Sequence, residues 1–501
     1  MGAPVPRQKV TAAIALAMIA SAVCAFLVML TLRGTRWWVF TLDDAFITLR
    51  YSAHWAHGLG PSWNPGAEPA EGYTTTLWMA LLALAIRLGL DGLLFAKLAG
   101  AGFAVGALAL ASHMAYRFSS RRALAACTPW LLACAYWPFT LHAVSGMETT
   151  CSAFILTLFF WLSSEPRWPR ALALSALFAC LARPEAALPC AVTLAFLLIQ
   201  QRGPLLRAVA LYTVLPGALY FALRTWYFGL LFPLSFYVKA TGQAPLAGLE
   251  DVVGFFAVFF VSQPWWGALA VLGTLRERAL RPAVWGALAF AVFFVFPEHI
   301  MAFESRYLVP LFPLLAALAG VGVSALVDWL ATRSRFAEPI VAASLTIAAA
   351  VPTSSLSNVE RWLDYGRGLT RAHVTFGHAL HDTGLRDARI AMLDVGAVGY
   401  YGDWYTLDTF GLNDAHVALT QRKDIDYVFR KKPDLLVLVS KKPREFQAVF
   451  EWEAPLYAES QRLGYRYTCE YEFEPDYLLQ VFAQRPDVTR DRVLCRDSLR
   501  P

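Results

Sequence analysis

Long apolar runs separated by short polar links cover the first 352 residues of the chain. The first run, Thr11 to Leu32, has 22 residues, close to the ~20 that cross a bilayer as an α-helix. It is longer than the ~7–15 apolar residues of a signal peptide, so we interpret it as an uncleaved first span. Ten further runs predict helices at 95–116, 123–140, 150–163, 171–182, 186–200, 205–223, 252–275, 283–297, 307–327 and 337–352.

The links between these runs predict the orientation. Several are basic (117–122, 165–170, 200–207, 276–281 and 331–335), and Arg7 and Lys9 precede the first run. By the positive-inside rule these segments face the cytoplasm, which gives eleven spans, a cytoplasmic N-terminus and an extracytoplasmic C-terminus. The remaining apolar stretch, 74–90, is then a short helix at the outer surface. If it spans instead, 171–200 forms one span.

Residues 353–501 have a different pattern, in which short apolar runs alternate with polar ones. The runs at 388–394, 434–440, 465–473 and 477–484 predict strands, and helices are expected near 357–383 and 443–463. We therefore expect a transmembrane domain over 1–352, whose first outer loop is 33–73, followed by a soluble α/β domain over 353–501.

Composition supports this division. The chain is 57% hydrophobic and 16% charged, whereas soluble domains carry about 25% charged residues. Charged residues make up 38 of the first 352 positions but 42 of the last 149. These values exclude a DNA-binding protein, a disordered scaffold and a single soluble domain, and they predict lipid rather than nucleic acid as a partner.

The eight cysteines show no zinc-binding spacing. Six lie in or beside apolar runs, which is typical of small core residues. Cys469 and Cys495 lie in the C-terminal domain, where an oxidising compartment would permit a disulfide. Nothing in the sequence fixes the distance between them, so both the bonded and the free state are open.

The outer loop from Thr41 to Trp78 carries the clearest chemical pattern. Asp43 and Asp44 open a predicted helix, and Arg50 lies seven residues after Asp43 on the same face. Gly and Pro residues in HGLGPSWNPG then end the helix. A carboxylate held beside a cation is a candidate general base. The alternative is a helix cap with an ordinary surface ion pair.

The pattern DDAFITLRY…HGLGPSWNPG…EGYTTTLW resembles the GT-C superfamily of membrane glycosyltransferases, most closely its AftB-like branch of terminal arabinofuranosyltransferases. The segments SGMET (145–149), ARPE (182–185), YFGLLFPLSFYVKATG (227–242), SRYLVPLFP (305–313) and DVGAVGYYGDWYTLDTFGLND (394–414) are similar to other parts of that branch. Leu234 and Ser235 depart from it, because relatives have Asn-Thr there.

The resemblance implies a GT-C fold and a role for each matched residue. Asp43 would be the catalytic base, and Asp44 would orient the acceptor or a metal. The donor phosphate would be bound by Lys239, Arg306, Tyr307 and Arg50. The acceptor side would be formed or supported by Glu71, Tyr73, Glu148 and Asp394. Glu71 and His299 are candidate ligands of a divalent metal, the one cofactor considered. An alternative for Lys239 and Arg306 is that their side chains extend to lipid headgroups. Separately, Arg183 is expected to form an ion pair with Glu185 or Glu148.

Together these features predict a bacterial plasma-membrane glycosyltransferase. Its donor would be a polyprenyl-phosphate sugar, with arabinofuranose as one candidate, and its acceptor a cell-envelope glycan at the outer face. Two alternatives belong to other classes: a flippase or transporter of lipid-linked sugars, and a non-enzymatic glycan-binding membrane protein. The chain shows no internal repeat of the kind expected in transporters.

Overall fold

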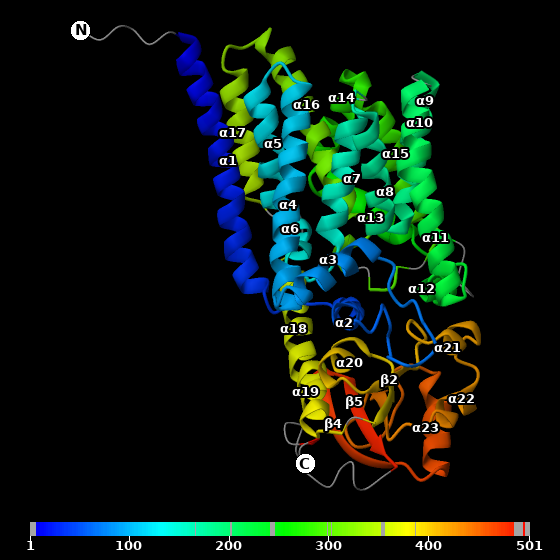
Figure 1. Cartoon of the computed structure of the whole chain (residues 1–501). Helices are drawn as coiled ribbons and strands as arrows, with labels where there is room; N and C mark the ends of the chain where they lie inside the picture. The colour runs from blue at the N-terminus through cyan, green and yellow to red at the C-terminus, as the bar shows by residue number, and fades with distance from the viewer. Residues whose placement is uncertain are drawn as a thin grey trace. The chain divides into compact units, whose positions relative to one another are not determined.

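The computed structural model describes residues 7–165, 167–200, 203–240, 246–297, 299–301, 303–351, 356–385, 387–484 and 494–495. It divides into two compact units, each of which takes residues from separate parts of the chain. Unit 1 comprises Met1–Trp38, Lys97–Phe221 and Gln243–Leu356, and unit 2 comprises Val39–Ala96, Ala222–Gly242 and Ser357–Pro501. The first outer loop therefore belongs to the same unit as the C-terminal domain. Figure 1 labels the elements.

The helices of the apolar part follow the predicted runs. They are α1 (Arg7–Trp37), α4 (Gly92–Arg117), α5 (Arg122–Ala135), α6 (Trp137–Ala143), α7 (Thr149–Ser163), α8 (Pro169–Ala182), α9 (Ala187–Gln200), α10 (Gly203–Val209), α11 (Leu215–Phe228), α13 (Leu249–Ala257), α14 (Pro264–Arg276), α15 (Arg281–Phe293), α16 (Phe312–Ala331) and α17 (Ala337–Ala349). Within unit 1, α16 packs along both α14 and α5. A Cβ on Gly273 of α14 or on Gly322 of α16 would overlap a backbone carbonyl of the other helix. Small residues thus let these two helices approach closely.

Fewer helices reach spanning length than the sequence predicts. Among the described residues, four segments are long and apolar enough to span alone: Ala13–Trp37, Gly92–Arg117, Gly203–Phe228 and Phe303–Ala331. Two bent pairs, Arg122–Ala135 with Trp137–Ala143 and Leu249–Val261 with Pro264–Arg276, would raise the number to six. The other apolar helices are shorter, so the count of eleven spans stays a prediction.

The two bends correct the sequence prediction, which treated 123–140 and 252–275 as continuous spans. The helices of the first pair meet at 78° and those of the second at 93°. Gln263 is non-helical, with φ −137° and ψ 66°, and it directly precedes Pro264. The proline ring disfavours helical geometry in the residue before it, which accounts for the second bend.

Unit 2 contains α2 (Asp43–Ala56), α3 (Thr76–Arg87), α12 (Leu234–Ala240), α18 (Leu356–Leu369), α19 (Thr375–Asp382), α20 (Gly396–Gly402), α21 (Ala415–Leu419), α22 (Ile425–Arg430) and α23 (Glu453–Arg462). At 12 residues and about 1.5 Å per residue, α3 is about 18 Å long. It is too short to cross the ~30 Å hydrocarbon core alone. The start of α2 at the acidic pair agrees with the sequence prediction.

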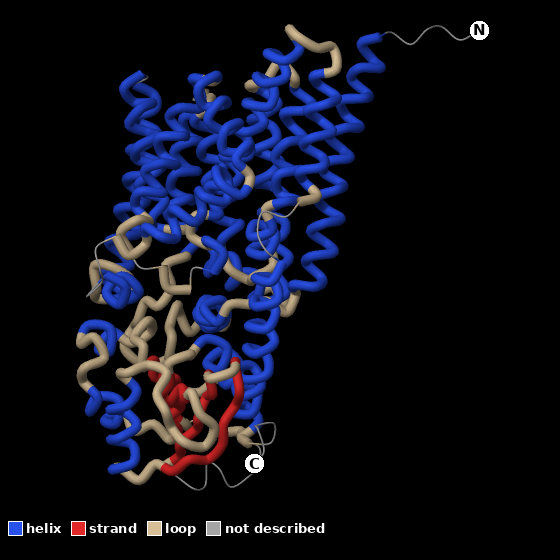
Figure 2. Tube along the Cα trace, turned by 180° about the vertical axis from the view of Figure 1, so that it is seen from behind, coloured by secondary structure: helices blue, strands red, loops and turns tan. Residues whose placement is uncertain are grey.

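The described strands lie in one five-stranded sheet, drawn in red in Figure 2. They are β1 (Arg389–Met392), β2 (Tyr405–Asp408), β3 (Leu435–Ser440), β4 (Arg466–Glu474) and β5 (Tyr477–Ala483), in the order β2-β1-β3-β5-β4. β1 runs parallel to β2 and β3, while β5 pairs antiparallel with β3 and β4. The sheet core includes Ala391, Leu407, Leu436, Leu438 and Phe482.

Two elements of this domain differ from the prediction. β2 was not expected, because it has only four residues and follows a left-handed turn at Asp403, where φ is 52°. The helix expected over 443–463 begins only at Glu453. Before it, the Ser440 hydroxyl accepts hydrogen bonds from the amides of Lys442 and Gln447, which closes residues 440–447 into a loop.

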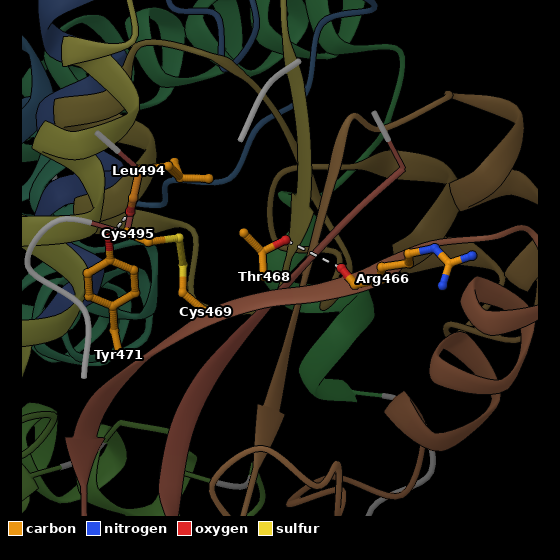
Figure 3. Close-up of a disulfide and its surroundings, with 6 residues drawn as sticks. All are labelled: Arg466, Thr468, Cys469, Tyr471, Leu494 and Cys495. Carbon is orange, nitrogen blue, oxygen red and sulfur yellow. Dashed lines mark hydrogen bonds between the residues drawn. A yellow bond between two sulfur atoms is a disulfide. The ribbon is translucent and has the colours of Figure 1, made fainter. Parts of the chain in front are cut away.

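The C-terminal cysteines are bonded to each other (Figure 3). Cys469 of β4 and Cys495 form a disulfide with a Cα–Cα distance of 5.9 Å. Beside it, the Tyr471 hydroxyl donates to the carbonyl of Leu494. The bond fastens residues 494–495 to β4, and it decides between the two cysteine states that the sequence left open.

Candidate functional site

The acidic pair lies at the start of α2, where carboxylates interact favourably with the helix dipole. Asp43 is only 8% exposed, and Asp44 is half-buried. Asp43 Oδ2 accepts a hydrogen bond from the amide of Gly396 at 2.9 Å, and Oδ1 accepts one from the amide of Ala397 at 2.8 Å. Both donors lie in the turn that follows β1. The C-terminal domain therefore holds the carboxylate of Asp43 in a fixed orientation.

Gly396 is a glycine because of this contact. A Cβ at position 396 would overlap the backbone oxygen of Asp43 and would lie 2.6 Å from Oδ2. The backbone at 396 can thus approach the carboxylate only without a side chain. The motif DVGAVGYY and the motif DDAFITLRY meet at this point.

A second layer of polar groups lies behind Asp43. The Tyr477 hydroxyl donates to Asp394 Oδ2 at 2.6 Å, and His373 Nε2 lies 3.2 Å from the same oxygen. His373 is buried in a π-helical turn between α18 and α19. The amide of Asp43 donates to the hydroxyl of Tyr365 at 3.4 Å. Asp394, expected on the acceptor side, is therefore part of a buried network around the candidate base.

This network sets the charge of Asp43. Burial raises its pKa from 3.8 to about 6, with His373 and the two amides acting in the opposite direction and Asp394 adding to the rise. For His373, burial alone would lower the pKa, but the hydrogen bond and charge of Asp394, together with Asp43, outweigh it and raise the pKa. A carboxylate whose pKa is near 6 is suited to general base chemistry near neutral pH.

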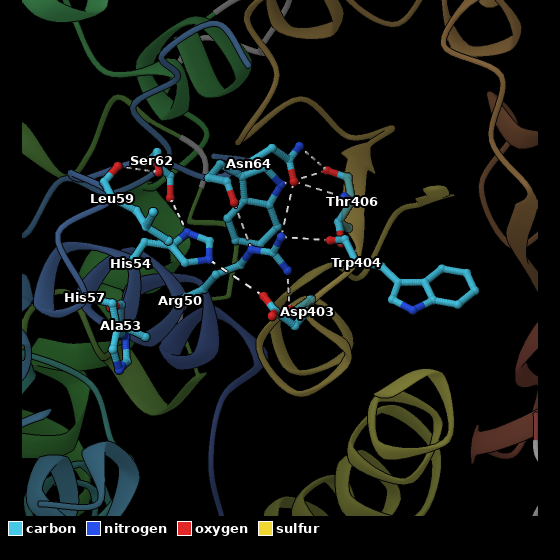
Figure 4. Close-up of polar contacts among 12 residues, drawn as sticks. Arg50, Ala53, His54, His57, Leu59, Ser62, Asn64, Asp403, Trp404 and Thr406 are labelled. Carbon is cyan, nitrogen blue, oxygen red and sulfur yellow. Dashed lines mark hydrogen bonds and ion pairs between the residues drawn. The ribbon is translucent and has the colours of Figure 1, made fainter. Parts of the chain in front are cut away.

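Arg50 is enclosed by the same unit (Figure 4). It is 3% exposed. Its Nε donates to the carbonyl of Trp63 at 2.9 Å, its Nη1 to that of Gly399, and its Nη2 to that of Trp404 at 2.8 Å and to Asn64 Oδ1 at 3.2 Å. The guanidinium also lies 4.6 Å from the Trp63 ring centroid. Arg50 thus connects the Gly- and Pro-rich loop to α20 and β2.

The same loop covers the free edge of β2. Trp63 Nε1 and Asn64 Nδ2 both donate to the carbonyl of Thr406, at 2.8 and 2.9 Å, and the amide of Thr406 donates to Asn64 Oδ1 at 3.0 Å. Because an uncovered edge strand exposes unpaired amides and carbonyls, this pairing accounts for the stability of so short a strand.

Glu71 and Tyr73 are positioned by residues that the sequence reasoning missed. Glu71 is 3% exposed and forms a bidentate ion pair with Arg224 of α11. Burial raises the pKa of Glu71, and Arg224 opposes that rise. Tyr73 packs edge-on against Tyr51, with ring centroids 4.9 Å apart. An arginine directly after the apolar run 205–223 was the available signal, because charges there are costly unless they are paired.

A second polar cluster, within unit 1, contains Glu148, Arg306 and Tyr307 together with Arg183. Arg183 pairs with Glu148 at 3.0 Å and with Glu185 through Nε at 2.8 Å, which confirms its expected ion pairs. The Tyr307 ring centroid lies 4.8 Å from the Arg183 guanidinium and 4.9 Å from that of Arg306. Arg306 is 4% exposed.

The structure gives no support to a metal at Glu71 or His299. His299 Nδ1 lies 2.9 Å from Asp251, and Nε2 lies 2.7 Å from the carbonyl of Phe294. Within the described residues, no group of three or more His, Cys, Asp and Glu side chains lies close enough to hold a metal. Lys239 lies in α12, but its side chain is outside the described part of the chain.

Solved structures share this fold. ArnT from Cupriavidus metallidurans bound to undecaprenyl phosphate aligns with a TM-score of 0.60 at 16% identity, covering 95% of this chain and 98% of ArnT. The oligosaccharyltransferase of Archaeoglobus fulgidus aligns with a TM-score of 0.52 at 13% identity, covering 84% of this chain and 69% of that one. At these identities the likeness concerns the fold. The predicted GT-C fold, a multi-span helical membrane protein with a C-terminal α/β domain, is confirmed.

Sequence comparisons add one family. Residues 364–489 match the family described as "Domain of unknown function (DUF8728)". The comparison with curated proteins finds no match. The matched range includes the turn whose amides hold Asp43.

Proposed function

We propose that the chain is a membrane glycosyltransferase that moves a sugar from a polyprenyl-phosphate carrier to a cell-envelope glycan. The observation that supports this most is the placement of Asp43, whose oxygens are held by two backbone amides in a fold shared with ArnT bound to undecaprenyl phosphate. A fixed carboxylate with a pKa near 6 is what a general base requires.

The proposed reaction has one transfer step. Asp43 accepts the proton of a hydroxyl group on the acceptor. At the same time, the oxygen of that hydroxyl attacks the anomeric carbon of the donor sugar. The bond from that carbon to the phosphate oxygen breaks, and polyprenyl phosphate leaves with the electron pair. Asp44, half-buried beside Asp43, would orient the acceptor. Cations near the leaving phosphate would stabilise its charge.

The matched residues keep these roles with one revision. Lys239, Arg306 and Tyr307 are proposed to bind the donor phosphate. Arg50 is reassigned to a structural role, because its nitrogens donate to carbonyls of unit 2 and to Asn64. Glu71, Tyr73, Glu148 and Asp394 are proposed as supporting residues. No metal role is assigned to Glu71, whose charge is neutralised by Arg224.

The proposal also covers where the protein lies in the cell, where its two domains begin and end, and which sugar it transfers. The protein would lie in a bacterial plasma membrane with a cytoplasmic N-terminus, a transmembrane domain over 1–352 and an extracytoplasmic domain over 353–501. Arabinofuranose is one candidate sugar. The Cys469–Cys495 disulfide supports the extracytoplasmic placement, because such bonds form in oxidising compartments.

The test is transfer by the purified full-length protein in lipid nanodiscs, supplied with a panel of polyprenyl-phosphate sugars and an acceptor glycan. We expect release of polyprenyl phosphate, reduced at least 100-fold in Asp43→Asn. Asp364→Asn, an exposed aspartate on α18, is the matched control and should retain full activity. Full activity in Asp43→Asn would overturn the mechanism. Movement of the intact lipid-linked sugar across the bilayer, or glycan binding without release, would support the two alternative classes.

A further inference from the structure

The backbone just before Arg306 is strained. Met301, Glu304 and Ser305 have φ values of 58°, 49° and 58°, in the left-handed region that residues with a side chain seldom adopt. They belong to the connection between α15 and α16. Backbone of this kind persists only where the surrounding fold holds it, and it is concentrated at functional sites. The contacts that hold this turn therefore bear on the direction of the Arg306 side chain.

A single carbonyl oxygen, that of Phe303, joins this turn to a distant histidine. It accepts a hydrogen bond from the amide of Arg306 at 3.1 Å, and Nε2 of His142 lies 2.9 Å from it. Because a carbonyl can only accept, Nε2 must carry the hydrogen in this contact. One shared oxygen thus separates His142 from the backbone of Arg306, although His142 and Phe303 are 161 positions apart.

A bend in the helices brings His142 to this position. His142 is fully buried in the last turn of α6, which meets α5 at 78°. The rings of Tyr136 and Phe139, near the start of α6, pack against Phe312 with centroids 4.8 and 5.0 Å apart. Phe312 is the first residue of α16. The helix that carries His142 is therefore packed against the segment of chain that follows Arg306.

The guanidinium of Arg306 is held as well as its backbone. Its Nη2 donates to the hydroxyl of Tyr307 at 3.3 Å, and that hydroxyl donates to the carbonyl of Ile300 at 2.7 Å. The Tyr307 ring is stacked on Phe294, with 5.5 Å between the centroids. The same loop thus contacts Arg306 at both ends, so its conformation determines where the guanidinium lies.

Arg183, the other arginine of this cluster, is committed to contacts within the protein. Its Nη1 donates to Glu148 Oε1 at 3.0 Å, and its Nε donates to Glu185 Oε1 at 2.8 Å. Two carboxylates thus balance its charge. The strained turn therefore adjusts the direction of Arg306, the arginine to which the donor phosphate is assigned above.

We propose that His142 is a positioning residue for the donor phosphate. Through the Phe303 carbonyl it holds the strained turn, and the turn directs the Arg306 guanidinium to the phosphate. A bidentate contact between a guanidinium and a phosphate depends on the direction of the fork, so a small rotation of the turn weakens it. The proposal rests on the proposed function, in which Arg306 binds the donor phosphate. It adds a residue that lies outside every motif matched in the sequence.

The test is equilibrium binding of radiolabelled farnesyl phosphate to the full-length protein in detergent micelles. His142→Gln places an amide nitrogen close to the position of Nε2 and should bind within about three-fold of the parent protein. His142→Asn is too short to reach the Phe303 carbonyl and His142→Phe has no donor, so both should weaken binding about 10-fold or more. His113→Phe, at an exposed histidine of α4, is the matched control and should bind within about two-fold.

A double-mutant cycle shows whether His142 acts through Arg306. His142→Asn should weaken binding about 10-fold in the parent protein but less than about two-fold in Arg306→Gln, where no guanidinium is left to position. An equal loss in both backgrounds would overturn the proposal. Equal binding by His142→Gln and His142→Asn would overturn it as well, and this comparison still decides if His142→Phe does not fold.

Transfer kinetics separate this proposal from the function. We expect His142→Asn to raise the donor KM about 10-fold while kcat stays within about two-fold of the parent value, because the change weakens donor binding. A general loss of structure would lower kcat too. Transfer with an unchanged donor KM in His142→Asn would reject the positioning role alone. Binding that depends on Arg306 and His142, without any transfer, would reject the function alone.

Discussion

At the scale of single residues, the charge of Asp43 depends on groups that lie more than 300 positions away in the chain. His373 lowers the pKa of Asp43, whereas Asp394 raises the pKa of both Asp43 and His373. Tyr365 also contacts Asp43, because its hydroxyl accepts the hydrogen bond of the Asp43 amide. The ionisation of the candidate base is therefore adjusted by the C-terminal domain.

The pH dependence of transfer should show this coupling. Asp43 must be ionised to accept a proton, so activity should fall as pH drops through about 6. Replacing His373 by Asn removes a side chain that lowers the pKa of Asp43, so this acidic limb should move upward by about one pH unit. The measurement is kcat/KM from pH 5 to 9. His378→Asn, an exposed histidine of α19, should leave the limb in place; an equal shift there would contradict the assignment.

Arg50 should matter for stability rather than for donor binding. Lys at position 50 cannot reach the carbonyls of Trp63, Gly399 and Trp404 together, and unsatisfied buried groups cost about 1–3 kcal/mol each. We expect a loss of about 2–4 kcal/mol, seen as a lower thermal midpoint in detergent, with an unchanged donor KM. Arg389→Lys, at an exposed arginine, should change the midpoint little. A raised donor KM with unchanged stability would restore the phosphate-binding role.

At the scale of elements, the site depends on the turn between β1 and α20. The amides of Gly396 and Ala397 are the first two of α20, and they hold Asp43 where neighbouring side chains alone could not. β2, the next strand, is in turn covered by Trp63 and Asn64. The C-terminal domain thus donates backbone amides to Asp43, and the loop that follows α2 donates side-chain hydrogen bonds to the backbone of β2.

Replacing Gly396 by Ala should therefore reduce transfer. The added Cβ would overlap Asp43 and displace its carboxylate from the two amides. We expect kcat to fall at least 10-fold while the protein still purifies as a single folded species. Gly102→Ala in α4 has open space around the added methyl group and should be neutral. Normal kcat in Gly396→Ala would show that the two hydrogen bonds are dispensable.

The sequence predicted where helices and strands lie better than it predicted which residues contact each other in the folded chain. Hydrophobic runs located the apolar helices and also β1, β3, β4 and β5, because these patterns are local. The bends at Tyr136 and Gln263 were missed because the apolar pattern continues through them. His373 and Arg224 were missed because their roles come from contacts between distant segments. Asp43 was found through a motif, but its amide partners depend on tertiary structure.

At the scale of the whole molecule, the disulfide joins Cys495, near the end of the chain, to β4 of the C-terminal domain. It closes a loop of 26 residues, which in the chain-entropy description stabilises the fold by about 3–4 kcal/mol. The two bonded cysteines, Cys469 and Cys495, belong to unit 2, which also contains Asp43 and Asp44. Loss of the disulfide should therefore lower the stability of the unit that positions Asp43, although the bond does not contact Asp43 itself.

Alkylation of the protein as isolated from membranes should show the bond directly. Under denaturing, non-reducing conditions six of the eight cysteines should react, and all eight after reduction. Ser at both 469 and 495 should lower the thermal midpoint, whereas Cys24→Ser, at an exposed cysteine, should not. Eight reactive thiols without a reductant would contradict an oxidised, extracytoplasmic domain.

The pairing of Asp43 with Gly396 also has a consequence during synthesis. The two residues are 353 positions apart, and at about 5–20 residues per second a ribosome needs about 20–70 s to travel between them. During that interval α2 has been synthesised, but the amides that fix the carboxylate of Asp43 do not yet exist. A nascent or truncated chain that ends before residue 396 would lack a positioned base. The two hydrogen bonds that fix Asp43 can therefore form only after residues 396 and 397 have been synthesised.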